Sequence, residues 1–175
     1  MNHQDVLIDG YKRIPHFLKI VLDGITQDKL DWRPHPDANS IGWLAWHLVR
    51  QHDGQVAPLI GEEQIWISQG FPARFKRPAN PMESGFGQTP EEAAAFKSPE
   101  ASVFLDYADA VTARTISYIK TLTEEDLDRE LDEPQYTPLP TVGVRLVSIL
   151  EDSQFHAGQA AYIRGLIEGY GWQNY

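Results

Sequence analysis

The chain contains no cysteine. This absence excludes a disulfide framework, a zinc site built on cysteine thiolates, and a nucleophilic thiol supplied by the protein itself. At 175 residues the chain is long enough to bury a core without such crosslinks. Any metal site in it must therefore use histidine, aspartate, glutamate or water as ligands.

Basic residues are scarce, with 15 Lys and Arg against 25 Asp and Glu, which gives a formal net charge of −10. Binding of nucleic acid needs a basic face for the phosphates, so the composition argues against it. The chain also lacks an apolar run of about 18 residues that would span a membrane. No secretory signal pattern opens the sequence. We expect a cytoplasmic protein that binds neither nucleic acid nor membrane.

Strand signals are weak, because no Asn-Gly or Asp-Gly turn stands between two runs of alternating polarity. Apolar residues instead recur every three to four positions in four segments, which predicts four amphipathic helices. Pro15 should kink the first of them or divide it in two. The predicted helices cover Gln4–Ile25, Ser40 to about Leu59, Ser98 to about Leu122, and Thr141 to Gly169 or Gly171.

Four long helices joined by loops predict an all-α fold, a four-helix bundle, as one domain over residues 1–175. Residues 70–99 are rich in proline and glycine and show no sustained period. They predict a long irregular connection between helices two and three. Connections of this length are uncommon in compact domains and are often functional.

Asp152 and His156 are the most informative pair in the sequence. They lie four residues apart, so they share one face of the fourth helix. That face is otherwise apolar, with Ile149, Ile163 and Ile167 along it. A metal ion is one way to satisfy such a pair, and a hydrogen-bonded pair with a purely structural role is another.

A third metal ligand should come from another helix, and the second helix offers His47 and His52. Periodicity slightly favours His52 as the buried one, whereas Gly54 leaves space beside His47. Helical spacing alone therefore leaves both candidates open. Arg145 shares the face of Asp152 and is a candidate to neutralise it or to bind an anionic substrate, although it is as well placed to reach solvent.

Three stretches together resemble the DinB superfamily, and the resemblance covers essentially the whole chain. The stretch that resembles the family's second-helix motif is Ser40-Ile-Gly-Trp-Leu-Ala-Trp-His47-Leu-Val-Arg50 followed by Asp53. The stretch that resembles its fourth-helix motif is Phe155-His156-Ala-Gly158-Gln159-Ala-Ala-Tyr-Ile-Arg164-Gly165. The stretch that resembles the connection of actinobacterial-type members is Gly85-Phe-Gly-Gln-Thr-Pro-Glu-Glu.

The resemblance implies an up-up-down-down bundle, commonly a homodimer, with one divalent metal held by helices two and four. It selects His47 rather than His52 and adds Asp152 and His156 as the other ligands. Asp152 stands where the family has the first histidine of a His-x-x-x-His pair. Two histidines and one carboxylate suit zinc, nickel, manganese or ferrous iron.

Family members with known activity are thiol-dependent transferases and isomerases that use mycothiol or bacillithiol. The resemblance therefore implies a metal-dependent enzyme that activates an external thiol toward a small-molecule substrate. Arg145, Gln159 and Arg164 are candidates to bind that substrate. Two alternatives stay open: a metal-dependent hydrolase that uses metal-bound water, and a non-enzymatic, stress-related dimeric bundle whose Asp–His pair is structural.

Overall fold

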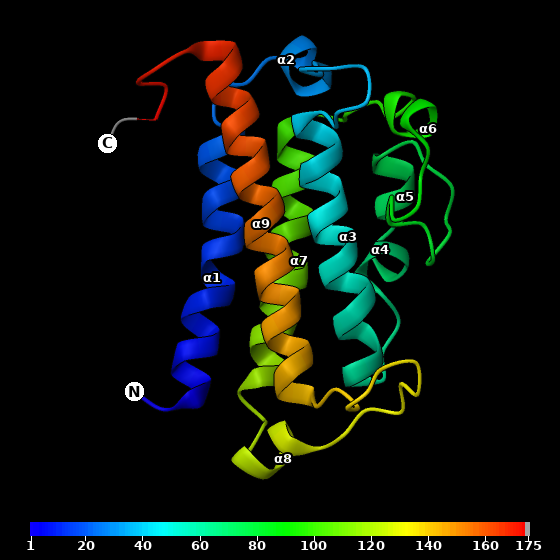
Figure 1. The fold of residues 1–175 in the computed structure, drawn as a ribbon, viewed down its shortest axis with the longest axis vertical. Helices are drawn as coiled ribbons and strands as arrows, with labels where there is room; N and C mark the ends of the chain where they lie inside the picture. The colour runs from blue at the N-terminus through cyan, green and yellow to red at the C-terminus, as the bar shows by residue number, and fades with distance from the viewer. Residues whose placement is uncertain (174–175) are drawn as a thin grey trace.

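The computed structural model describes residues 1–173, and within them the chain folds into four long and five short helices (Figure 1). The predicted all-α four-helix bundle is confirmed. Residues 174–175, which the predicted domain also includes, lie outside the described residues. The long helices are α1 (His3–Leu22), α3 (Ile41–Ile60), α7 (Ala101–Ile119) and α9 (Val142–Glu168); the short ones are α2 (Gln27–Asp31), α4 (Ile65–Ser68), α5 (Phe71–Arg74), α6 (Pro90–Ala94) and α8 (Glu124–Asp128).

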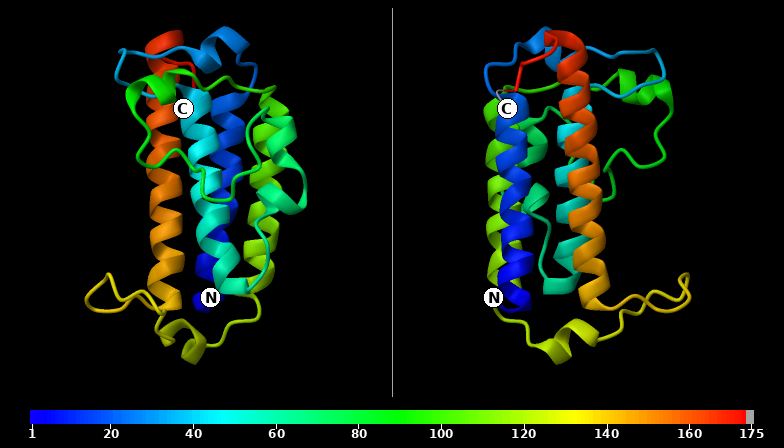
Figure 2. Two further views of the ribbon diagram at one scale, coloured as in Figure 1. Left: turned by 90° about the vertical axis from the view of Figure 1, so that its right-hand side faces the viewer. Right: turned by 60° about the vertical axis from the view of Figure 1, so that its left-hand side comes forward.

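The four long helices form a square in which α1 and α3 each pack against both α7 and α9. The beginning of α1 meets the end of α7, where the Gln4 amide donates to the Leu122 carbonyl. The end of α1 meets the end of α9, where Arg164 donates to the Val21 carbonyl. Helices α1 and α9 therefore run in one direction, and α3 and α7 run in the other (Figures 1 and 2).

The predicted up-up-down-down order is therefore wrong, and the order is up-down-down-up. Residues 23–40 close over one end of the bundle, so α3 returns antiparallel to α1. The long connection 61–100 then runs back beside α3 (Figure 2), so α7 starts at the end where α3 started. A long connection is what allows two consecutive helices to be parallel, whereas a short one makes them antiparallel.

Capping residues define the helix ends where the sequence predicted them. The Ser40 hydroxyl accepts from the Trp43 backbone N–H at the start of α3, and Thr141 does the same for Val144 in α9. Helix α3 ends at Gly61, whose φ of 75° is the left-handed conformation that glycine adopts at little cost. These local signals position the second and fourth helices.

The first helix is not divided at Pro15, which was one of the two predicted alternatives, and the predicted start of the third helix is wrong. Pro15 lies inside α1 without dividing it, and buried Tyr11, Ile14 and Leu18 around it offset the lost backbone hydrogen bond by packing into the core. Helix α7 begins after Glu100 rather than after Ser98, whose backbone N–H is taken by the Asp31 carboxylate.

The bundle interior is filled by large aromatic and aliphatic side chains, among which Trp46, Trp66, Tyr11 and Tyr107 are fully buried. Across residues 1–173, every helix is too short or too polar to traverse a lipid bilayer.

His52 lies fully buried in this interior. Its Nε2 is 2.8 Å from the Thr115 hydroxyl. That hydroxyl donates its own hydrogen to the Val111 carbonyl, so the His52 Nε2 must be the donor. Burial, together with the positive charge of Arg114, lowers the pKa of His52 from 6.5 to about 3. His52 is therefore a neutral core residue at ordinary pH.

We predict that His52 makes the protein less stable in acid. Between pH 6.5 and pH 3 the unfolded chain binds a proton at this position and the folded chain does not, so stability falls as the pH falls. At pH 5 the loss is about 2 kcal/mol relative to pH 8. Urea unfolding at both pH values should show this extra loss in the wild type but not in His52→Gln. An unchanged pH dependence in that variant contradicts the prediction, and exposed His16→Gln is the control.

Candidate metal centre

His47 of α3 and the pair Asp152 and His156 of α9 gather where the two helices pack together. One possible ligand atom from each lies within 4.8 Å of the others. The i,i+4 spacing places the α9 pair on one face, and the antiparallel packing of α3 brings His47 opposite to it. His52 lies elsewhere in the core. The structure thus brings together the three residues that the sequence motifs indicated.

The His47 ring is held in a defined orientation. It is only 5% exposed and stacks on Trp43, with ring centroids 4.7 Å apart and planes at 15°. Its Nδ1 lies 2.5 Å from the backbone carbonyl of Ser84. Because a carbonyl can only accept, Nδ1 carries the hydrogen and Nε2 keeps its lone pair. An outer acceptor of this kind is typical of histidines that bind metals through the other nitrogen.

His156 has the same arrangement on the facing helix. Its Nδ1 lies 2.8 Å from Oε1 of Gln159, and its Nε2 lies 3.4 Å from Oδ1 of Asp152. With the Gln159 oxygen as acceptor, the Nε2 lone pair faces the carboxylate. Two acceptors that face each other repel unless a cation or a proton lies between them. The His156 ring also meets His47 edge-on, with centroids 4.7 Å apart.

Asp152 supplies the negative charge of the group. Its side chain is 36% exposed, yet its Oδ2 is buried and has no hydrogen-bond partner among residues 1–173. A buried carboxylate oxygen without a partner is costly. A divalent cation would satisfy it, so the donor set and its surroundings fit a metal ion. Donor atoms that share a zinc ion at about 2.0–2.2 Å lie roughly 3.5 Å apart, which small side-chain adjustments would reach here.

The two histidines differ in their affinity for protons. Burial lowers the pKa of His47, and the neighbouring His156 lowers it further, against opposing effects of the Ser84 carbonyl and Asp152. Burial alone would also lower the pKa of His156. The hydrogen bonds that protonated His156 makes with Asp152 and Gln159, together with the charge of Asp152, outweigh the effect of burial, so the pKa of His156 is raised. A bound metal competes with that proton, so metal affinity should weaken in acid.

Two clefts open beside the group. The first, of about 750 Å³, is lined by Asp152, Phe155, Arg145 and the loop 136–140. The second, of about 690 Å³, is lined by Gln159, Phe155 and the loop 37–39. Both volumes lie in the usual range of small-molecule sites. Phe155, which is 64% exposed, forms a wall common to both clefts.

Arg145 lines the first cleft, but its guanidinium is already engaged. It donates to the Gln55 side-chain oxygen at 2.8 Å and forms an ion pair with Glu133. Its positive charge is therefore balanced by Glu133, and neither a hydrogen bond nor an ion pair joins it to Asp152 among the described residues.

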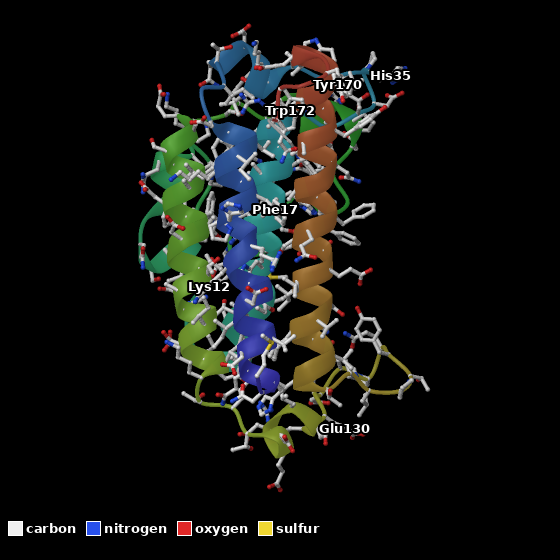
Figure 3. The ribbon with its side chains drawn as sticks, turned by 90° about the vertical axis from the view of Figure 1, so that its left-hand side faces the viewer. Lys12, Phe17, His35, Glu130, Tyr170 and Trp172 are labelled. Atoms are coloured by element: carbon white, nitrogen blue, oxygen red, sulfur yellow. The ribbon has the colours of Figure 1, made fainter. Side chains whose placement is uncertain are left out.

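Arg164 does not belong to this group. Its Nη1 donates to the carbonyls of Ile20 and Val21 at the end of α1. Its guanidinium also lies 5.1 Å from the ring centroid of Trp172, a residue beside the C-terminal end of α9 (Figure 3). Arg164 therefore fastens α9 to α1, and the structure gives it a structural role.

Sequence reasoning missed the outer shell of the site, which comes from residues 84–88 in the long connection. Gly85 has a φ of 90°, and a Cβ there would lie 2.6 Å from Trp43 and 3.2 Å from Nδ1 of His47. The Trp43 indole N–H donates to the Gln88 side-chain oxygen at 2.9 Å. The available signal was the Gly85-Phe-Gly87 stretch, but nothing local indicates that its backbone lies against a helix far away in sequence.

Comparisons with known proteins agree with this fold. The sequence profile of the DinB superfamily matches residues 11–160. A crystal structure described as a conserved protein of locus from Enterococcus faecalis superposes with a TM-score of 0.87 at 33% sequence identity. The match covers 97% of this chain and 99% of that one. Among curated proteins, none matches.

We predict that His47→Ala abolishes zinc binding, because it removes the donor that α3 contributes. Calorimetric titration should show about one zinc per chain for the wild type and none for the variant. His52→Gln should still bind zinc, because His52 lies outside the group. Loss of binding in His52→Gln alone would mean that the wrong histidine has been assigned.

We further predict that Gly85→Ala weakens zinc binding about 10- to 100-fold, the usual effect of losing an outer-shell contact. The added Cβ would collide with Trp43 and displace the Ser84 carbonyl from His47. Gly87→Ala is a matched control, because Gly87 also has a positive φ, 77°, but nothing lies within 4 Å of its Cβ position. Equal zinc affinities in the two variants would contradict the prediction.

Proposed function

This chain belongs to the DinB superfamily, and we propose that it is a divalent-metal-dependent enzyme that joins a low-molecular-weight thiol to a small electrophilic substrate. His47, Asp152 and His156 are its metal ligands. The observation that carries the proposal is that both histidines have their Nδ1 hydrogen committed to an outer acceptor, which leaves the Nε2 lone pair of each for a metal, next to Asp152, whose Oδ2 is buried and unpaired among the described residues.

The divalent metal ion would supply one chemical function, and the residues around it would supply the others. A divalent cation lowers the pKa of a coordinated thiol and so supplies a thiolate at neutral pH. The residues of the chain have separate tasks around it. The Ser84 carbonyl and Gln159 hold the Nδ1 hydrogens of His47 and His156 and keep the rings oriented. Asp152 contributes a negative charge that partly balances the cation.

The absence of cysteine is compatible with this reaction, because the thiol would come from the low-molecular-weight cofactor and not from a side chain of the protein. The two clefts support a reaction of two organic molecules. One cleft reaches Asp152 and the other reaches Gln159, with Phe155 between them. Transfer of a thiol needs room for both partners, whereas hydrolysis needs room for one substrate and a water molecule. This arrangement favours transfer over the hydrolytic alternative.

An assay with a model electrophile tests the proposal. Protein loaded with zinc, nickel, manganese or ferrous iron would be mixed with 1-chloro-2,4-dinitrobenzene and either mycothiol or bacillithiol. The thiolate sulfur forms a bond to the ring carbon as chloride leaves, and the thiol proton goes to solvent. We predict that conjugation exceeds the uncatalysed rate only when metal and thiol are both present, and that His47→Ala lowers it to the background.

Other results would decide against the proposal in distinct ways. Metal-dependent cleavage of a model ester without any thiol would favour a hydrolase. If the wild type binds none of the four metals, both the transferase and the hydrolase hypotheses are wrong, and the Asp152–His156 pair has a structural role. In that case His156→Ala would lower the unfolding free energy without affecting metal content.

A further inference from the structure

Arg50 of α3 is a buried cation whose hydrogen bonds extend away from its own helix. It is 1% exposed, and its guanidinium lies 4.7 Å from the ring centroid of Trp66. Its Nη2 donates to the carbonyl of Pro81 at 2.8 Å, and its Nε donates to the carbonyl of Glu83 at 2.9 Å. Arg50 therefore holds two backbone positions of the long connection at fixed places beside α3.

The charge of Arg50 is balanced inside the protein. Asp53, one turn later on α3, lies 3.6 Å away, and both side chains are fully buried. The Tyr107 hydroxyl donates to Asp53 at 2.7 Å and accepts from Arg50 at 3.0 Å. Arg114 also donates to Asp53, at 2.6 Å. A planar guanidinium with five N–H groups in a rigid fork is the side chain that suits several carbonyl acceptors at once.

The two carbonyls that Arg50 holds stand immediately before the outer-shell contact of the metal centre. Ser84 follows Glu83 directly, and its carbonyl accepts from Nδ1 of His47. His47 lies one turn before Arg50 on the same helix. Helix α3 thus contacts residues 81–84 twice, first through Arg50 and then through His47.

We propose that Arg50 is a positioning residue for the candidate metal centre. By fixing residues 81–83 it places the Ser84 carbonyl so that His47 keeps its hydrogen on Nδ1 and presents Nε2 to a metal. The metal part of this inference rests on the proposed function, but the tautomer of His47 does not, because it is set in the protein without metal.

Arg50→Lys tests this idea, because lysine keeps the positive charge beside Asp53, but the three N–H groups of its ammonium cannot replace the rigid guanidinium fork that serves four acceptors. The first measurement is the nitrogen-15 chemical shift of the His47 ring in metal-free protein. The wild type should show the Nδ1–H form, and the variant a mixture of both tautomers. The second measurement is zinc affinity, which should fall about 10- to 100-fold.

Two control variants separate positioning from general stability. Arg74→Lys makes the same substitution at a surface ion pair with Asp106 and should change neither measurement. Ile14→Ala opens a cavity in the bundle core beside α1, which lies on the opposite side of the bundle from the long connection (Figure 1). It should lower the unfolding free energy while leaving the His47 tautomer unchanged.

A milder variant keeps the test decisive if Arg50→Lys fails to fold. Gln64 accepts from Nη1 of Arg50 at 2.9 Å and donates to the Pro81 carbonyl at 3.1 Å. Gln64→Ala should therefore shift the tautomer and the zinc affinity in the same direction by a smaller amount. Wild-type tautomers in every folded variant would overturn the inference. A wild type that binds none of zinc, nickel, manganese and ferrous iron would overturn the proposed function, and the tautomer of His47 alone would then decide the role of Arg50.

Discussion

The buried ion pair of Arg50 and Asp53 is the interaction on which the rest of this structure depends. Two opposite charges inside a bundle are costly unless each finds further partners, and here both do. Asp53 accepts from the backbone N–H groups of Ile65 and Trp66, so it fixes α4. Arg50 fixes residues 81–83. One pair of side chains on α3 therefore holds both halves of the long connection against the helix that carries His47.

This attachment explains how an irregular segment can serve a functional site. Residues 61–100 follow the outside of α3 rather than extending into solvent (Figure 2). Their backbone carries the Ser84 carbonyl to His47, and Gly85 permits the close approach to Trp43 and His47 that any side chain would prevent. The helices thus supply the metal-ligating atoms, and the connection supplies the contact that orients one of them.

Much of the fold could be predicted from the sequence because the relevant signals are local. The 3–4 spacing of apolar residues and the starts of two helices at Ser40 and Thr141 depend on neighbours within one or two turns, and those predictions are confirmed. The helix directions were predicted wrongly, because direction depends on how a connection crosses the bundle. The start of α7 was misplaced because Ser98 does not cap it: the Ser98 hydroxyl has no hydrogen-bond partner among the described residues, and its backbone N–H bonds to distant Asp31.

The sequence by itself determined the pair on α9: Asp152 and His156 must share a face because helical geometry alone relates them. It also required any metal site to avoid thiolates, since there is no cysteine. Helical spacing could not choose between His47 and His52, and only the motif resemblance did. Tertiary structure decided the role of each histidine. The His47 ring contacts His156 of α9 and the Ser84 carbonyl, whereas the His52 ring contacts Thr115 in the core. Those partners are distant in sequence, so only packing brings them together.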